Sequence, residues 1–267
     1  MTTAHAPSPA PGAARGRPLW PARTGRRRGP ALRTARNLLR WFAPIAGIYA
    51  AIVVVVVVAV PLVVASVGHV EMSVVWFARQ SGIWFPFSVL IGVAAAYPPV
   101  HVANGMTRRS YVRGALGAVV VIAAVLSAGM TAALLAERTW YRAMGWDWGL
   151  VDGWFAPSEG LVAVFISYLA TYLVAHLSGL LVGTVYAVGG GWWGTLTLPL
   201  TVGPVLLVAT LVGDGGDWRP FADVVGGEPG TGTPPLAVLA VATVLAAALA
   251  AAFSVLTRRR AIAPRRG

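Results

Sequence analysis

Five long stretches of the chain contain no Asp, Glu, Lys or Arg, and this feature limits the folds that the chain can adopt. The stretches cover residues 41–70, 80–107, 114–136, 160–213 and 229–257. A helix needs only about 20 apolar residues to cross the hydrocarbon core of a bilayer, so each stretch can span it. The fourth, at 54 residues, can hold two spans. We therefore expect an all-α integral membrane protein with six transmembrane helices.

The expected boundaries follow from these stretches. The Gly-rich run from Val188 to Gly194 interrupts the fourth stretch and supplies a break between two spans. The spans are expected at about residues 42–68, 84–103, 114–136, 161–187, 195–213 and 236–256. They form one membrane domain over residues 31–257, between a basic tail at 1–30, which is expected to be disordered, and a second basic tail at 258–267.

The charges between the stretches are sorted by sign. Seventeen of the 21 Arg lie in the N-terminal tail, the loop 104–113 and the C-terminal tail, whereas all nine acidic residues lie in the other three loops. Arg in short loops favours the cytoplasmic side, and acidic residues contribute little to orientation. We therefore expect a multi-pass protein of the cytoplasmic membrane with both termini inside.

The composition excludes several classes of function. A net charge of +12 could indicate nucleic-acid binding. However, the Arg clusters adjoin the spans and no RNA-binding motif accompanies them. We therefore expect these Arg to contact anionic lipids, and we expect no nucleic-acid partner. The chain has no Cys and no Lys, and a Walker A phosphate loop requires Lys. The four His lie on different segments. No catalytic residue, metal site or cofactor is expected, and the chain is not expected to be an enzyme.

A short basic segment precedes the first span. Its apolar stripe comprises Leu32, Ala35 and Leu39, and the adjacent basic positions are Arg33, Arg36 and Arg40. This pattern predicts a short amphipathic helix that lies on the inner leaflet. The alternative is a basic flank without regular structure.

The loop 104–113 is the only internal loop on the basic side that carries charge. Asn104 and Gly105 indicate a turn, and Thr107 can cap a following helix. A compact basic surface would then be presented by Arg108, Arg109 and Arg113. The alternative is that these Arg only anchor the topology.

The fourth span carries the most polar intramembrane face. Tyr168, Tyr172 and His176 recur at i, i+4 and i+8, so they share one side of the helix. Such groups are candidates for function, or a single His can be hydrogen-bonded between packed helices. Gly179 and Gly183 follow as a pair that allows close helix packing.

Several of these features together resemble a known family. A basic surface helix, a second span that ends in Gly-x-Thr-Arg-Arg-x-Tyr, six spans, and Glu137 at the end of the third span are similar to the permease subunits of type-2 ATP-binding-cassette exporters, especially small actinobacterial ones. The resemblance covers about residues 31–257. The stretch from Gly179 to Tyr186 also resembles the end of the family's fourth span.

The resemblance implies a function and partners. In that family the loop after the second span forms a coupling helix that docks on a separate ATPase subunit, and two permeases form a homodimer or heterodimer. The matching residues are Gly105, Thr107, Arg108, Arg109 and Tyr111. We therefore expect a permease subunit that exports an unidentified substrate with energy from a separate ATP-binding subunit.

Two other classes of function stay open from the sequence. A secondary transporter or channel usually has ionisable residues within its spans, and only His176 could serve here. A membrane scaffold or resistance protein that binds a partner without transport is also compatible with the sequence. A neighbouring gene for a P-loop ATPase would distinguish the exporter from both.

Overall fold

The computed structural model describes residues 29–149, 160–212 and 235–259, and every regular element in these ranges is an α-helix. The helices are α1 (Pro30–Val67), α2 (Val74–Ala103), α3 (Arg108–Met144), α4 (Leu161–Leu196), α5 (Leu198–Val212) and α7 (Pro235–Arg259). Five of them are long and apolar enough to cross a membrane, whereas α5 has 15 residues. The described chain is therefore all-helical, as expected, and is consistent with an all-α membrane protein.

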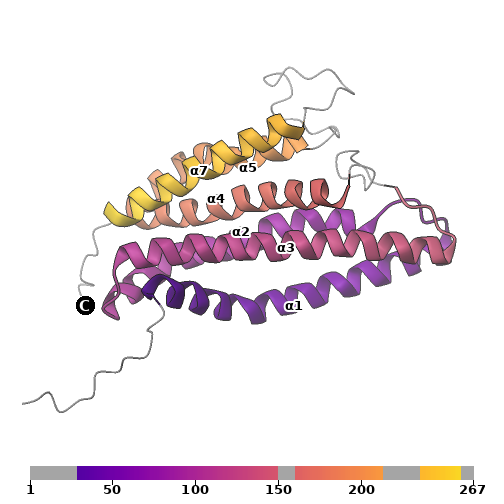
Figure 1. The fold of residues 1–267 in the computed structure, drawn as a ribbon, viewed down its shortest axis with the longest axis horizontal. Coiled ribbons are helices and arrows are strands. Elements are labelled where there is room, and N and C mark those ends of the chain that lie inside the picture. The colour runs from indigo at the N-terminus through magenta and orange to yellow at the C-terminus, as the bar shows by residue number, and fades with distance from the viewer. Residues whose placement is uncertain (1–28, 150–159, 213–234, 260–267) are drawn as a thin grey trace, which may run out of the picture.

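Helix α4 lies at the centre of the bundle. Helices α2 and α3 pack against it on one side and α5 and α7 on the other, while α1 lies outermost against α3 (Figure 1). Helix α4 is mostly apolar without a single apolar stripe, as expected for a helix with neighbours on several sides. Successive helices alternate in direction, so the start of α1 and the end of α7 lie at the same end of the bundle (Figure 1).

The charges that are sorted along the sequence are also separated in space. The end that holds the start of α1, the start of α3 and the end of α7 carries only basic charges among its described residues (Figure 1): Arg33, Arg36, Arg40, Arg108, Arg109, Arg113, Arg258 and Arg259. The described residues at the opposite end are of both signs: Glu71, Arg79, Glu137, Arg138, Arg142 and Asp147. We refer to these two ends as the basic end and the mixed end.

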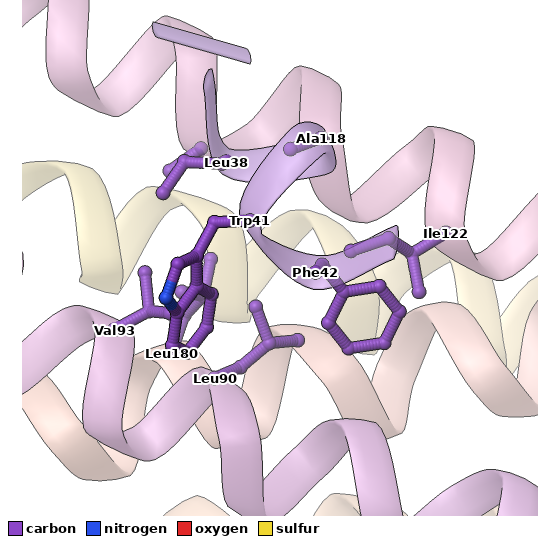
Figure 2. Close-up of a pocket in the computed structure, with 9 residues that line it drawn as sticks. Leu38, Trp41, Phe42, Leu90, Val93, Ala118, Ile122 and Leu180 are labelled. Atoms are coloured by element: carbon purple, nitrogen blue, oxygen red, sulfur yellow. The ribbon is translucent and has the colours of Figure 1, made fainter. Parts of the chain in front are cut away.

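The expected surface helix before the first span is not a separate element. Helix α1 is continuous from Pro30, and its first turns bury Thr34, Leu38 and Phe42 against the bundle. Figure 2 shows Leu38 and Phe42 next to α3, around a small apolar cavity that residues of α2 and α4 also line. The buried stripe is thus shifted from the predicted one, because it packs on protein instead of on lipid.

Two of the helices extend beyond the charge-free stretches that predicted the spans. Helix α2 begins at Val74 rather than at residue 84, and α3 continues to Met144, where Gly145 ends it in a left-handed conformation. A helix of 37 residues is ~55 Å long and exceeds the ~30 Å hydrocarbon core. Residues 137–144, which follow the third charge-free stretch, thus extend α3 beyond the part that a bilayer core can cover.

The Gly-rich run interrupts the regular helical path within α4, at the place where the sequence indicated a break. Gly190 has φ 73° and ψ −175°, a conformation that only glycine adopts without strain, and helical structure resumes up to Leu196. The chain then reverses at Thr197 into α5. The N-terminal tail, the loop 214–234 and most of the C-terminal tail lie outside the described residues.

Candidate functional site

At the basic end, the connection between α2 and α3 is shorter than the sequence suggested. Gly105 has φ 72° in the turn, and Thr107 is the N-cap of α3, as predicted, because its hydroxyl accepts the Ser110 N–H at 3.2 Å. Helix α3 already begins at Arg108. Within the described chain no separate coupling helix lies between α2 and α3, since the Arg-rich segment forms the first turns of α3 itself.

A buried histidine, which was not among the residues predicted for this site, fastens the connection to α2. The Ser110 hydroxyl donates to the Thr107 carbonyl at 2.7 Å, and His101 Nε2 lies 3.1 Å from Ser110 Oγ. Because the hydroxyl has only one proton, His101 Nε2–H is the donor to Ser110. The basic residues of the loop are visible in the sequence, whereas a His at the end of an apolar span gives no periodic signal of its own.

Tyr111 extends this contact to α7. Its ring lies 6.0 Å from Tyr97, 5.6 Å from His101 and 6.2 Å from Phe253 of α7. Tyr111 is only 1% exposed, so it belongs to the core and not to a docking surface. The start of α3 is therefore held by both α2 and α7.

The three Arg at the start of α3 have two different environments. The Arg108 guanidinium donates through Nη1 to the carbonyl of Arg258 at 3.0 Å, in the last turn of α7, where helix carbonyls lack internal partners. Arg109 and Arg113 are exposed and lie four residues apart on one face. Arg108 thus links α3 to α7, while Arg109 and Arg113 remain available to a partner.

Within the membrane domain, the polar face expected on α4 is present. Tyr168, Tyr172 and His176 are all buried and stack in order along α4, with ring centroids 5.8 and 5.9 Å apart. Tyr172 lies so close to Gly82 of α2 that a Cβ atom at Gly82 would be 2.7 Å from the phenol oxygen. Tyr172 and His176 both contact Gly82, so this face of α4 packs against α2.

His176 has a specific hydrogen-bond partner on α2. Its Nε2 lies 3.3 Å from the carbonyl oxygen of Gly82, and Pro86 stands four residues after Gly82 inside α2. Proline has no N–H, so the Gly82 carbonyl lacks its usual helical donor. Since a carbonyl only accepts, Nε2 carries the proton, and Nδ1 has no partner among the described residues. His176 therefore stabilises the proline-containing part of α2.

The glycine pair on α4 makes the closest helix contact in this region. A Cβ atom at Gly179 would lie 2.5 Å from the Phe87 carbonyl oxygen, and one at Gly183 would overlap the Ile91 carbonyl. Both positions face the α2 backbone directly. Gly179 and Gly183 thus allow α2 to approach α4 closely just beyond Pro86.

At the mixed end, Glu137 caps the start of α2. Its carboxylate accepts the backbone N–H groups of Val74 at 2.8 Å and Val75 at 2.9 Å, the Trp148 indole N–H at 3.2 Å, and the Ser73 hydroxyl. A carboxylate is favourable at a helix N-terminus because it meets unpaired N–H groups and the positive end of the dipole. The sequence indicated Glu137 only as the end of a span and carried no signal for this role.

Further contacts close the mixed end around Glu137. Ser73 N–H donates to the Gly149 carbonyl at 2.9 Å, and Gly149 N–H donates to the Glu71 carbonyl at 3.1 Å. The guanidinium of Arg79 lies 4.8 Å from the ring centre of Trp76. The links α1–α2 and α3–α4 are therefore joined to one another beside the carboxylate.

The chain was compared with known proteins on the basis of its sequence and its structure. No protein-family model, curated protein or solved structure matches it. In the described residues, no group of three or more His, Asp or Glu side chains is arranged to hold a metal ion. The findings show a helical protein with several apolar helices that can cross a membrane, and they identify no family.

Proposed function

We propose that the chain is the membrane-spanning permease subunit of an ATP-binding-cassette exporter, which moves an unidentified substrate across the cytoplasmic membrane. The observation that supports this most is the exposed pair Arg109 and Arg113 at the start of a helix that is clamped to its neighbours. The sequence has no Lys and therefore no Walker A loop, so ATP hydrolysis must come from a separate subunit.

The contacts at the basic end suit a surface that transmits force. A push on the start of α3 would pass to α2 through His101 and Ser110, and to α7 through Arg108 and the Arg258 carbonyl. The buried ring of Tyr111 adds apolar contacts to both neighbours. An ATPase that moves this surface would therefore move three helices together.

The orientation and assembly are parts of the same proposal. The Arg-rich end would face the cytoplasm, because Arg in short loops stays on that side. Both termini would then be cytoplasmic, and two permease subunits would form a homodimer or heterodimer with their ATPases. Anionic lipid headgroups would contact the remaining Arg at this end.

The geometry of His176 favours this proposal over proton-coupled transport. Its Nε2 proton is used by the Gly82 carbonyl, and the side chain is 0% exposed. A proton carrier must exchange with water and must be able to release its proton. A packing role accounts for the position of His176 without any transport of protons.

The test compares two double variants that lose the same charge. Tagged chain is purified from its own cell membranes, and the eluate is assayed for ATP hydrolysis and for a polypeptide labelled by an azido-ATP analogue. Arg109→Ala with Arg113→Ala should lower both signals at least tenfold, because truncating one side of a desolvated interfacial pair costs ~2 to 5 kcal/mol. Arg33→Ala with Arg36→Ala, on exposed positions of α1, should lower them less than twofold.

Insertion of both variants is checked first, since Arg also sets topology. The proposal fails if wild-type eluate contains no ATP-binding polypeptide. The docking assignment fails if a correctly inserted Arg109→Ala, Arg113→Ala variant retains the full ATPase signal.

A further inference from the structure

A groove of about 370 Å³ opens on the side of the bundle between α2 and α5. Trp84, Phe87 and Ile91 of α2 form one wall, and Leu198 and Val202 of α5 form the other. Its floor is Val182 of α4. The volume falls in the usual range of ~300 to 1,000 Å³ for ligand pockets.

The position of the groove along the bundle determines what surrounds it. Every lining residue belongs to the charge-free stretches 80–107 and 160–213, which are the stretches expected to cross the hydrocarbon core. Apart from the Tyr186 hydroxyl, the lining side chains carry only hydrocarbon and the indole of Trp84. A molecule that fills the groove must therefore be apolar over most of its length.

One end of the groove has a different character. Tyr186 lines the groove near the start of α5, and its hydroxyl lies 3.0 Å from Thr195 Oγ1 where the chain turns back past Gly190 and brings Gly194 against the Tyr186 ring. Next to this bend, Trp192 is 80% exposed and Trp193 is 59% exposed. Exposed Trp is typical of the headgroup level of a membrane. The apolar groove thus ends in hydroxyl groups at the level expected for the bilayer interface.

We propose that this groove binds one acyl chain of a membrane phospholipid, with its ester and headgroup region beside Tyr186 and Thr195. The apolar walls suit a hydrocarbon tail, and the hydroxyl groups of Tyr186 and Thr195 suit the polar part of the same molecule. A flexible hydrocarbon tail can occupy the whole length between the two walls.

The experiment uses a phosphatidylcholine with a diazirine in one acyl chain, titrated into the purified full chain in detergent. After illumination, adducts are mapped by mass spectrometry. Adducts on the groove segments 84–91 and 198–202 should saturate as the lipid concentration rises. Helix α1 supplies an internal reference for non-specific contact, because Val54, Val55 and Val63 are more than 60% exposed. Adducts on α1 should rise without saturation.

Filling the groove provides the matched comparison. Val202→Trp and Ile91→Trp fill it from opposite walls and should each lower the groove adducts at least fivefold, while Val55→Trp on α1 should leave them unchanged. Elution as a monodisperse peak is required of each variant. The proposal is overturned if groove adducts fail to saturate, or if both filling variants keep them.

A second copy over the groove is the competing outcome. The chain has no Cys, so Leu198→Cys introduces a single thiol at the wall of the groove. Efficient disulfide-linked dimers in native membranes, together with no saturable lipid adduct there, would identify the groove as a subunit contact and overturn the proposal. Saturable adducts without such dimers would support it. Neither result depends on an ATPase partner, so this test is independent of the proposed function.

Discussion

His176 on α4 donates a hydrogen bond to the carbonyl of Gly82 on α2 across a distance of 3.3 Å. That carbonyl needs an outside donor because Pro86, which follows four residues later, has no N–H. In a bilayer core no water can replace a missing donor, so the partner must come from another helix. This hydrogen bond therefore gives His176 a structural role.

A double-mutant cycle tests this relationship. His176→Leu should lower the free energy of unfolding by ~1 to 3 kcal/mol, because it leaves the buried Gly82 carbonyl without a donor. In a Pro86→Ala background the loss should be smaller by ~1 kcal/mol or more, since the introduced alanine can donate its own N–H to the Gly82 carbonyl. Unfolding of the purified chain in mixed micelles, titrated with dodecyl sulfate, measures all four proteins. Equal losses in both backgrounds would show that His176 and Pro86 are not coupled.

Transport gives a second and separate result for His176. His176→Gln keeps an amide N–H that can reach the Gly82 carbonyl, so it should lower stability only modestly and leave transport largely intact. Abolished transport by a folded His176→Gln variant would favour proton coupling through this residue instead. The measurement requires an assay of the substrate once that substrate is known.

At the mixed end, the carboxylate of Glu137 should contribute more to the free energy of unfolding than that of Glu71. Glu137→Gln removes an anion that accepts two backbone N–H groups at the start of α2, and should cost ~1 to 3 kcal/mol. Glu71→Gln, at an exposed position, should change stability by less than ~0.5 kcal/mol. Hydrogen exchange at Val74 and Val75 should accelerate in the Glu137 variant only. Unchanged protection there would mean that the cap contributes little.

Because α2 and α4 are in close contact, a single methyl group added at Gly179 or Gly183 should lower the stability of the bundle strongly. Gly179→Ala and Gly183→Ala place a Cβ atom against the carbonyls of Phe87 and Ile91, and each should destabilise the bundle by ~1 to 3 kcal/mol or more. Gly92→Ala, on α2 with open space around it, should be neutral or stabilising because alanine favours the helix. Thermal melting in detergent compares the three. Similar melting temperatures for all three variants would contradict the packing described here.

The topology can be tested on a background that has no native thiol. Arg109→Cys, at the basic end, should react with a membrane-impermeant maleimide only after the membrane is opened. Asp147→Cys, at the mixed end, should react in intact cells. The opposite pattern, or labelling of both from outside, would show that the orientation expected from the Arg distribution is wrong.

The sequence alone determined the class of this protein, because charge and hydropathy along a chain decide which segments can enter a bilayer. It also indicated that Thr107 caps a helix and that Gly179 and Gly183 face a neighbour. Helix α2 begins at Val74, before the charge-free stretch starts at residue 80, and Arg79 is buried within the helix. Hydropathy identifies the apolar part of a helix, but it does not predict the helical turns that extend beyond that part.

Only the tertiary structure decided which groups act together. Glu137 and Val74 are 63 positions apart and His176 and Gly82 are 94 apart, so no local pattern connects them. The three Arg at the start of α3 also differ for a tertiary reason. Arg108 is hydrogen-bonded to the end of α7, whereas Arg109 and Arg113 are exposed. Periodicity indicates the face on which a side chain lies, whereas its hydrogen-bond partner depends on the register between helices, which is set by packing.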